Sequence, residues 1–538
     1  MLTALNLGNF KAFAETQNIP IRPLTLIFGA NSAGKSSILH GLLFAREALE
    51  SGNLDVRKPG LAGNSLDLGG FKQFIHRHQP QTSFTWGAEF QLPKELELFS
   101  LANSKPWSIG LSVEIAESPL SVAPVQMDIS VMGNLFLRLS LRSPVFSNSP
   151  EIFSQRGARR NASNTFWGKA HRFLIQDLDL DHALAHLHFF PTLEKLMGRK
   201  LGRTEQLKIR NIVEELTGEI TALVEKFIPK EAELVCPDDH FSESFRQAYP
   251  QLVKWMENGK NWRDLPKLPP LGKMPKTHYK GIIGVVLFAT LDEILRKTYN
   301  LMTDALGGLT YLGPLRFYPE RHSAFSEKRD DWYSQGEYAW DCLCSNDELR
   351  EQANAWLKTM GIHYHVNPRI WHAKKTGRMP PDSRKELALL DIRNGTVVSP
   401  RDIGIGVSQL LPIIVTACGG QNQIHAIEQP EIHVHPALQA ELGDLFIESA
   451  LGERKNTFLL ETHSEHLLLR IMRRMRETHL KTLPKGCTPI TQNEVSILFV
   501  ETDGARSIVR EMPLNDLGEL VKAWPGGFFE EGYRELFH

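Results

Sequence analysis

An apolar run followed by a glycine-rich loop and a helix is the feature that most constrains this chain. Residues 24–28 form the apolar run, residues 29–36 read GANSAGKS, and residues 36–49 carry an apolar stripe with helical spacing. The loop fits the pattern GxxxxGK[ST], in which backbone N–H groups surround phosphate oxygens at the positive end of a helix. The sequence therefore predicts a P-loop between a buried strand and a helix.

The P-loop pattern assigns expected contacts to its residues. The lysine of such a loop, here Lys35, reaches the β- and γ-phosphates, and the next hydroxyl, here Ser36, ligates Mg²⁺. ATP and Mg²⁺ are therefore the expected cofactors. The residues expected to bind the nucleotide are Gly29, Asn31, Ser32, Ala33, Gly34, Lys35, Ser36 and Ser37.

An acidic motif follows another short apolar strand much later in the chain. Residues 424–427 form the strand, and Glu428 opens the run EQPE. A carboxylate at the C-terminal end of a parallel strand can face the P-loop and ligate its metal ion. Glu428 is therefore the expected second protein ligand of Mg²⁺.

A glycine-containing turn precedes the acidic strand. Residues 404–409 read GIGVSQ and lead into a predicted helix at residues 408–418, with Ser408 as its N-cap. The start of such a helix can bind an anion, and in two chains placed head to tail it would face the partner's γ-phosphate. Gly406, Ser408 and Gln409 are therefore expected to contact nucleotide. The alternative is an ordinary capped helix.

A third strand also ends in polar residues. Residues 457–460 form the strand, and residues 461–464 read ETHS. The neutral imidazole of His463 can hydrogen-bond a phosphate oxygen, so we expect it to sense the γ-phosphate. A histidine with a purely structural role is the alternative.

Together these motifs resemble those of ABC-type ATPases in the SMC-like and OLD-like group, over residues 1–50 and 390–480. The runs EQPEIHVHP at 428–436, YLGPLR at 311–316 and WPGGFF at 524–529 resemble a bacterial branch of AAA family ATPases. That branch is similar to the ATPase subunits of Septu-type anti-phage defence systems. The resemblance implies a homodimer with ATP between its heads. It also implies control of DNA or of a nuclease-like effector protein from the same operon.

The chain departs from the ABC pattern at the residue after Glu428. ABC-type ATPases usually carry a glutamate here that activates the attacking water, whereas this chain has Gln429. Glutamine can position water but cannot accept its proton, so slow hydrolysis is expected. Three interpretations stay open: a glutamine native to this branch, a substitution that traps nucleotide, or transfer of the base role to Glu431. The expected catalytic residues are Glu428, Gln429, Glu431 and His463.

Alternating strands and helices predict an α/β fold, an ABC-type ATPase head with a mainly parallel sheet. Short alternating runs between residues 82 and 141 predict an antiparallel β subdomain. Helical periodicity predicts a mostly helical insertion, with helices at 163–176, 184–196, 205–227 and 282–306. The expected divisions are 1–150 (first half of the head), 151–306 (insertion), 307–480 (second half of the head) and 481–538 (C-terminal α/β tail).

Weaker candidates lie outside these motifs. Gln73, within GGFKQF, matches the metal-contacting glutamine of a Q-loop, with a surface loop as the equal alternative. The HxH at 433–435 is a weak metal pattern and is expected to belong to a loop. Arginines crowd one helix at 470–476, where a solvated basic face is the default and a contact to nucleic-acid phosphates the alternative. Arg316 and Arg321 flank a proline-containing turn, and one of them is expected to reach a phosphate or to pair with an acid.

Bulk composition limits the functional classes. The net charge is −1, so any contact with DNA is expected from a local patch. The five cysteines include no CxxC pair, which indicates a reducing, cytoplasmic location. No signal peptide and no apolar run of about 18 residues is found, so no membrane association is expected. A nucleotide-gated switch is the leading hypothesis. A nearly inactive ATP-dependent scaffold and a transporter's nucleotide-binding subunit are the alternatives.

Overall fold

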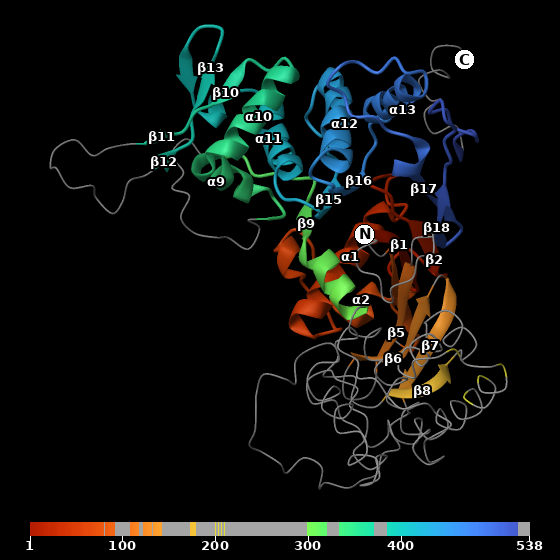
Figure 1. The fold of residues 1–538 in the computed structure, drawn as a ribbon. Helices are drawn as coiled ribbons and strands as arrows, with labels where there is room; N and C mark the ends of the chain where they lie inside the picture. Colours follow the sequence, from red (N-terminus) through yellow and green to blue (C-terminus); the bar gives the residue numbers. More distant parts are fainter. Residues whose placement is uncertain are drawn as a thin grey trace, which may run out of the picture. The chain divides into compact units, whose positions relative to one another are not determined.

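The computed structural model describes most of the chain outside the predicted insertion (Figure 1). The described residues are 1–79, 81–91, 108–117, 122–131, 133–141, 173–178, 200, 203, 206, 209, 298–319, 333–370 and 385–525. They fall into two compact units. The first takes its residues from 1–2, 48–54 and 81–304, and the second from 3–47, 55–80 and 305–538.

The second unit is built on a sheet of six described strands. Their order is β18 (Arg506–Glu511), β17 (Val495–Asp503), β3 (Leu24–Gly29), β16 (Thr457–Glu461), β15 (Ile424–Glu428) and β9 (Leu309–Leu312). Neighbours pair in parallel except β17 and β18, which form an antiparallel hairpin. Every residue of β3, β15 and β16 is buried, as expected where a parallel sheet is covered on both faces. The predicted α/β fold with a mainly parallel sheet is confirmed.

Five helices of this unit share one hydrophobic core with the sheet (Figure 1). They are α9 (Glu337–Ser345), α10 (Asp347–Thr359), α11 (Ile405–Cys418), α12 (Pro436–Leu451) and α13 (Glu465–His479). Helices α9 and α10 pack against α11, and α12 packs against α13. Trp340, Leu410 and Phe446 lie fully inside this core. The core therefore fixes the loops that join β15 to α12 and β16 to α13.

The second unit also contains shorter elements. The described segments are β10 (Tyr364–Val366), β11 (Arg369–Ile370), β12 (Lys385–Glu386), β13 (Leu389–Asp391), β14 (Thr396–Val398), α2 (Phe71–Phe74), η1 (Gly60–Ala62), η2 (His76–His78), η8 (Pro400–Asp402) and η9 (Gln492–Glu494). Strands β10, β13 and β14 form a small antiparallel sheet, and β11 pairs with β12. None of the described helices has the length and apolar character needed to cross a bilayer.

The N-terminal hairpin packs on the helix that follows the P-loop. β1 (Leu2–Gly8) pairs with β2 (Gln17–Pro20), and α1 (Lys35–Ser51) lies against β1. A Cβ on Gly41 would lie only 2.7 Å from a methyl carbon of Leu7, so glycine allows the close approach. An aromatic cluster completes the contact through Phe10, Phe44, Phe71 and Phe74. This packing fixes the start of α1.

The first unit contains an antiparallel meander. Its strands are β4 (Phe84–Gln91), β5 (Ser108–Glu117), β6 (Val122–Val131), β7 (Asn134–Leu141) and β8 (Phe173–Leu178). Each strand pairs with the next in antiparallel register. The predicted antiparallel β subdomain is confirmed.

Part of the predicted helical insertion is wrong. The helix expected at 163–176 is a strand at its end, because residues 173–178 pair with β7 along its edge. Residues 206, 209 and 298–306 are helical, as expected, and residues 203 and 307, just outside the predicted helices, are helical as well. The remaining helices predicted between residues 151 and 297 lie outside the described residues. So does the tail after Pro525.

Candidate nucleotide site

The P-loop has the backbone that its glycines predict. Gly29 (φ 144°) and Gly34 (φ 97°) adopt angles that residues with a side chain rarely adopt. A Cβ on Gly34 would lie 2.4 Å from the side chain of Ala12, and one on Gly29 would lie 2.2 Å from the Val500 carbonyl oxygen. Residues 30–32 are exposed at the tip of the loop. The loop is therefore held closely on both sides and open at its tip.

The other P-loop residues divide between the loop and the helix. Ala33 is buried, and Ser37 is buried with its N–H donating to the Gly34 carbonyl at 3.1 Å. Lys35 Nζ donates to the carbonyls of Gly29 at 3.1 Å and Ala30 at 2.9 Å. The lysine thus lies across the mouth of the loop that a phosphate group would enter.

Glu461 joins the P-loop, although the sequence motifs did not single it out. The Ser36 hydroxyl donates to Glu461 Oε2 at 2.6 Å, and Lys35 Nζ lies 3.9 Å from Oε1. The reason is the strand register, since Glu461 pairs with Ile27 on β3 and with Glu428 on β15. The signal that identifies Glu461 is its place at the end of a strand next to β3.

Glu428 is held by side chains from β9, α1 and the loop after β9. The Tyr311 hydroxyl donates to Glu428 Oε1 at 2.9 Å, and His40 Nε2 lies 3.6 Å from the same oxygen. Arg316 Nη2 donates to the backbone carbonyls of Glu428 at 2.8 Å and Gln429 at 3.1 Å. Burial and the Glu428 charge raise the pKa of Tyr311, so its hydroxyl stays a donor. Arg316 therefore holds the acidic motif in place by binding its backbone carbonyls.

The oxygen donors of the site suit a Mg²⁺–nucleotide complex. Burial and the neighbouring Glu428 charge raise the pKa of Glu461 to about 7. Burial lowers the pKa of Lys35, against the attraction of Glu461. A second cation next to the two carboxylates would relieve their repulsion. The Ser36 hydroxyl and the carboxylates of Glu428 and Glu461 are the hard oxygen ligands that Mg²⁺ takes.

The turn after Glu428 is strained and anchored to the next strand. Gln429 has a left-handed φ of 45°, and its N–H donates to the Glu461 carbonyl at 2.7 Å. Glu431 accepts hydrogen bonds from the Thr462 hydroxyl and the His463 N–H, each at 2.7 Å. Both Glu431 oxygens are therefore engaged in joining this turn to the ETHS loop.

His463 lies at the start of that loop, half-buried. Burial and the charge of Lys35 lower the pKa of its imidazole, so the ring is neutral at pH 7. The charge of Lys35, which follows β3, thus acts on the His463 ring, which follows the neighbouring strand β16. These properties are those required of the proposed γ-phosphate sensor.

The predicted N-cap at Ser408 is wrong. Helix α11 begins at Ile405 with Gly404 as its N-cap, so Ser408 lies in the second half of the first turn. Ser408 and Gln409 are buried, and the Ser408 hydroxyl reaches the Pro400 carbonyl at 3.4 Å. A Cβ on Gly406 would lie 2.6 Å from the His433 carbonyl oxygen, which lets this helix start approach the acidic loop. Ile405 is the exposed side chain here, at 47%.

The weaker candidates lie apart from these contacts. Gln73 is exposed on α2. His433 has a left-handed φ of 60°, and His435 is the N-cap of α12 through its Nδ1. Within the described part of the chain, no group of three or more histidine, cysteine or acidic side chains is placed to hold a metal ion. The HxH pair thus belongs to a loop, as expected.

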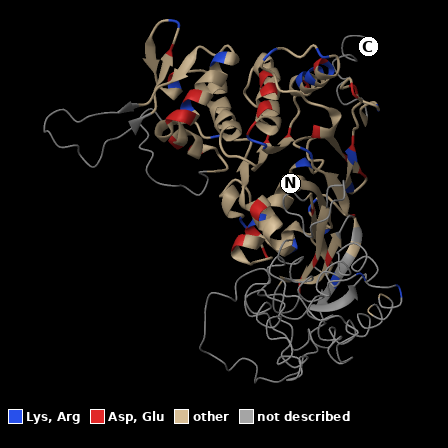
Figure 2. Ribbon diagram, in the orientation of Figure 1, with Lys and Arg blue, Asp and Glu red and all other residues tan. Residues whose placement is uncertain are grey.

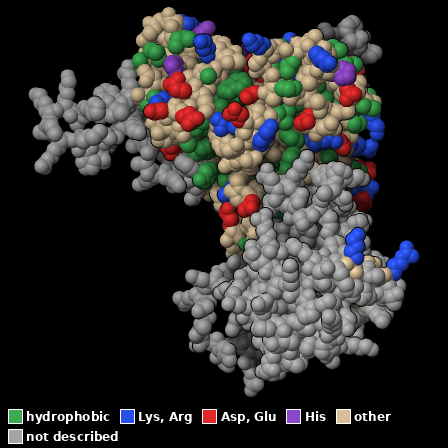
Figure 3. All heavy atoms as spheres, viewed as in Figure 1, with side chains coloured by type: hydrophobic (Ala, Val, Ile, Leu, Met, Phe, Trp, Pro, Cys, Tyr) green, Lys and Arg blue, Asp and Glu red, His purple; other side chains and the backbone are tan. Residues whose placement is uncertain are grey.

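The arginine-rich helix is largely neutralised by acids. Arg470 pairs with Glu441 and Asp444 on α12, and Arg474 pairs with Asp444. Figure 2 shows acidic positions along the ribbon of α12 and basic positions along that of α13, and the two helices pack against each other. On the face drawn in Figure 3, acidic and basic side chains are interspersed over the described elements. The ion pairs indicate that these arginines stabilise the packing of α13 on α12.

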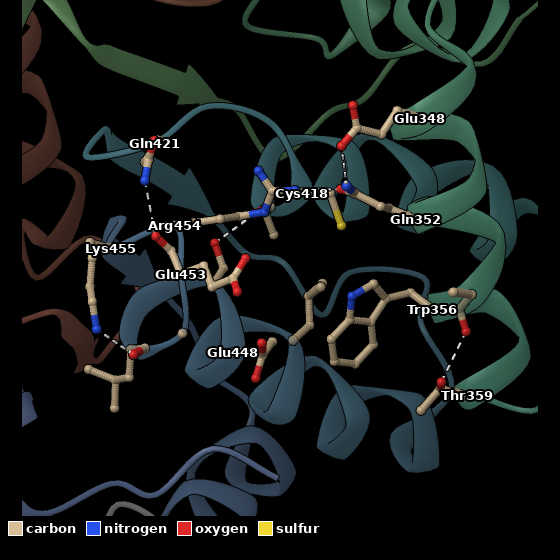
Figure 4. A pocket seen from close by; sticks show the side chains of 16 residues that line it. Glu348, Gln352, Trp356, Thr359, Cys418, Gln421, Glu448, Glu453, Arg454 and Lys455 are labelled. Atoms are coloured by element: carbon tan, nitrogen blue, oxygen red, sulfur yellow. Dashed lines mark hydrogen bonds between the residues drawn. The ribbon is translucent and has the colours of Figure 1, made fainter. Parts of the chain in front are cut away.

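A groove of about 910 Å³ lies at the other edge of the sheet (Figure 4). It is lined by α10 and by the C-terminal ends of α11 and α12, with Trp356 and Glu448 facing the space. Arg454 bridges it by donating to Gln352 Oε1 and to the Gly420 carbonyl. No residue of the candidate nucleotide site lines this groove. Glu428 lies at the C-terminal end of β15, whereas the groove lies near the N-terminal ends of β15 and β16.

Comparison with known families finds a match over part of the chain. Residues 343–468 match the family model of the AAA ATPase domain, a range that contains Ser408, Glu428 and His463. This match implies binding and hydrolysis of ATP. No curated protein matches the chain.

Solved structures that resemble the chain include heads of SMC proteins. One is an SMC head bound to the C-terminal winged-helix domain of ScpA, with 10% identity, a TM-score of 0.36, and coverage of 96% of this chain and 98% of that chain. Another is an SMC head from Pyrococcus furiosus bound to the C-terminal domain of ScpA (12%, 0.35, 95% and 96%). A third is the SMC head domain from Thermotoga maritima (8%, 0.35, 96% and 99%).

Lys35→Ala should weaken ATP binding by about 10–100-fold, because it removes a charge-assisted hydrogen bond to phosphate. Isothermal titration calorimetry with ATP measures the change, and circular dichroism checks the fold. Lys58→Ala, at an exposed lysine of the same unit, is the matched control and should bind like the wild type. Unchanged ATP affinity in Lys35→Ala would contradict the P-loop assignment.

Glu461→Gln should stabilise the protein only at higher pH. Because the pKa of Glu461 in the folded protein is raised to about 7 from the usual 4.5, ionising it costs stability as pH rises through this window. The glutamine variant avoids that cost. We expect it to exceed the wild type by on the order of 1–3 kcal/mol at pH 8 and to match it near pH 4.5.

Urea unfolding of both proteins at a series of pH values measures this difference, and subtraction cancels the titration of other groups. A difference that does not change with pH would show that Glu461 ionises freely in the folded protein.

Proposed function

We propose that this protein is an ATPase switch in which two heads close over two Mg²⁺–ATP complexes. The observation that carries the proposal is the meeting of Lys35, Ser36, Glu461 and Glu428 at one edge of the sheet. These are the cationic, hydroxyl and carboxylate groups that a Mg²⁺–nucleotide site uses. Closure would then control DNA or a partner effector.

Residues of the site have separate roles in nucleotide binding and hydrolysis. Backbone N–H groups of the P-loop and Lys35 hold the phosphates, while Ser36 and Glu428 hold Mg²⁺, with Glu461 next to them. The bound Mg²⁺ would neutralise charge on the phosphates during hydrolysis. Gln429 positions the attacking water, and the neutral ring of His463 hydrogen-bonds the γ-phosphate. Gln429 cannot accept the proton of that water, and both Glu431 oxygens already accept hydrogen bonds, from the Thr462 hydroxyl and the His463 N–H.

Slow turnover suits a switch, since the closed state must last long enough to act on a partner. A nearly inactive scaffold is the second candidate, and the same feature favours it: Gln429 cannot accept a proton. The rate of the glutamate variant separates the two.

Dimer closure would use the start of α11. Gly404 and Ile405 are exposed there, next to the backbone N–H groups of the first helical turn. An exposed apolar side chain at a helix N-terminus suits a surface that another head and its γ-phosphate would cover. The closed state is therefore proposed to be a homodimer.

We propose that a partner protein carries out the activity that this ATPase controls. The resemblance to ATPase subunits of Septu-type systems supports a role in anti-phage defence or DNA processing, with a nuclease-like effector from the same operon. A cytoplasmic location is supported by the four described cysteines, which are all free thiols. Purification from the native operon, followed by mass spectrometry, tests for that effector. A membrane permease as the bound partner would contradict the proposal.

Gln429→Glu should raise ATP turnover by as much as about 10²–10⁴-fold, because it supplies a base at the attacking water. The two side chains have the same shape, so the strained turn is kept. A steady-state phosphate-release assay measures the rate. Gln421→Glu, at an exposed surface position, is the matched control. An unchanged or lower rate would favour the scaffold.

Ile405→Arg should prevent ATP-dependent dimerisation while leaving ATP binding intact, because bulk and charge are added only at the exposed start of α11. Light scattering with the non-hydrolysable analogue AMP-PNP measures the mass. Leu480→Arg, at a residue 55% exposed at the end of α13, is the control and should still dimerise. Ser408 cannot serve for this test because its side chain is buried. Dimerisation of Ile405→Arg would defeat the closure model.

A further inference from the structure

Two residues outside the predicted motifs connect the N-terminal turn to the acidic strand. His40 lies on α1, and its Nε2 is 3.6 Å from Glu428 Oε1. On the other side of the ring, Nδ1 is 2.7 Å from Lys11 Nζ. The side chains of His40 and Glu428 are only 12% and 11% exposed. The contact between His40 and Glu428 is thus largely shielded from water, and the half-buried Lys11 lies at its outer end.

These contacts fix the tautomer of His40. Lys11 keeps its proton at neutral pH, although burial lowers its pKa to about 8. A lysine ammonium can only donate, so Nδ1 is the acceptor and the ring proton lies on Nε2, on the side of Glu428.

The contacts also separate the two oxygens of Glu428. Tyr311 donates to Oε1 at 2.9 Å, and His40 approaches the same Oε1. Neither of these groups uses Oε2. The carboxylate is thus held by one oxygen, which leaves the other for a metal ion.

The turn that carries Lys11 is fixed by the packing that also fixes the P-loop. Lys11 has a left-handed φ of 49°, and its N–H donates to the Phe74 carbonyl at 2.6 Å. Its own carbonyl lies 2.8 Å from His76 Nδ1. The next residue, Ala12, is the one that leaves no room for a Cβ on Gly34. Lys11 therefore cannot shift without moving the P-loop.

Another buried histidine of this unit shows what a structural histidine looks like here. His425 on β15 lies against the ring of Phe458, with centroids 5.0 Å apart, and its Nδ1 is 2.6 Å from the Thr310 hydroxyl. These neighbours are uncharged. His40 differs because each of its ring nitrogens faces a charged side chain.

We propose that His40, oriented by Lys11, is a positioning residue that sets the Glu428 carboxylate for Mg²⁺. The inference rests on the proposed function, because it assigns Glu428 to the metal ion. Groups that orient a metal ligand change metal affinity by about 10–100-fold when they are removed. A histidine that only fills space changes stability and leaves metal affinity unchanged in the folded protein.

The test is Mn²⁺ binding to the AMP-PNP complex, titrated by electron paramagnetic resonance. His40→Leu should raise the Kd for Mn²⁺ by about 10–100-fold. Lys11→Met should raise it by less, because the ring remains but its orientation is lost. His40→Gln keeps an N–H donor and should recover most of the affinity. Binding of AMP-PNP without metal should not change in any of the three.

His425→Gln is the matched control, since it alters a buried histidine of the same unit and should lower stability without changing Mn²⁺ affinity. Circular dichroism checks the fold of each variant. An unchanged Kd for Mn²⁺ in His40→Leu overturns the inference. If His40→Leu does not fold, an unchanged Kd for Mn²⁺ in Lys11→Met overturns it. A wild-type protein that binds neither AMP-PNP nor Mn²⁺ would instead defeat the proposed function.

Discussion

The pairing of β15 with β16 places two carboxylates side by side, and the rest of the site follows from that constraint. Glu428 and Glu461 are directly opposite each other at the ends of these parallel strands. Burial, and next the repulsion from the Glu428 charge, raise the pKa of Glu461. Relief must come from cations and donors. β3 is the other neighbour of β16, so its P-loop brings Lys35 and Ser36 to Glu461.

Local patterns predicted the parts of the fold whose cause is local. The strands β3, β15 and β16 are short, mostly apolar runs, and each was predicted as a strand from that pattern. The P-loop was predicted because its glycines, lysine and serine are adjacent in sequence. Glu461 was not, because its role depends on which strands become neighbours. His40 and Lys11 were missed for the same reason: nothing in either local sequence indicates a carboxylate from β15.

Two other differences between sequence and structure also arise from distant contacts. The glycines at 404 and 406 suggested a turn, yet α11 starts among them because Gly406 can approach the His433 carbonyl closely. Ser408 is thereby carried into the core. The arginines at 470–476 suggested a basic face, whereas α12 supplies acids to two of them. In both cases the deciding partner lies on an element that the local pattern does not contain.

Arg316 connects the acidic turn after β15 to helix α11 by hydrogen bonds. Its Nη2 donates to the carbonyls of Glu428 and Gln429, while its own carbonyl accepts from the Gln409 side chain on α11 at 3.2 Å. Burial lowers its pKa to about 10, so it remains a cation at neutral pH. Its Nε and Nη1 have no hydrogen-bond partner among the described residues, and such burial is costly. The charges of Glu431 and Glu428 oppose that cost. Because Gln409 lies one turn beyond the exposed start of α11, Arg316 is the residue that connects this part of α11 to the acidic turn.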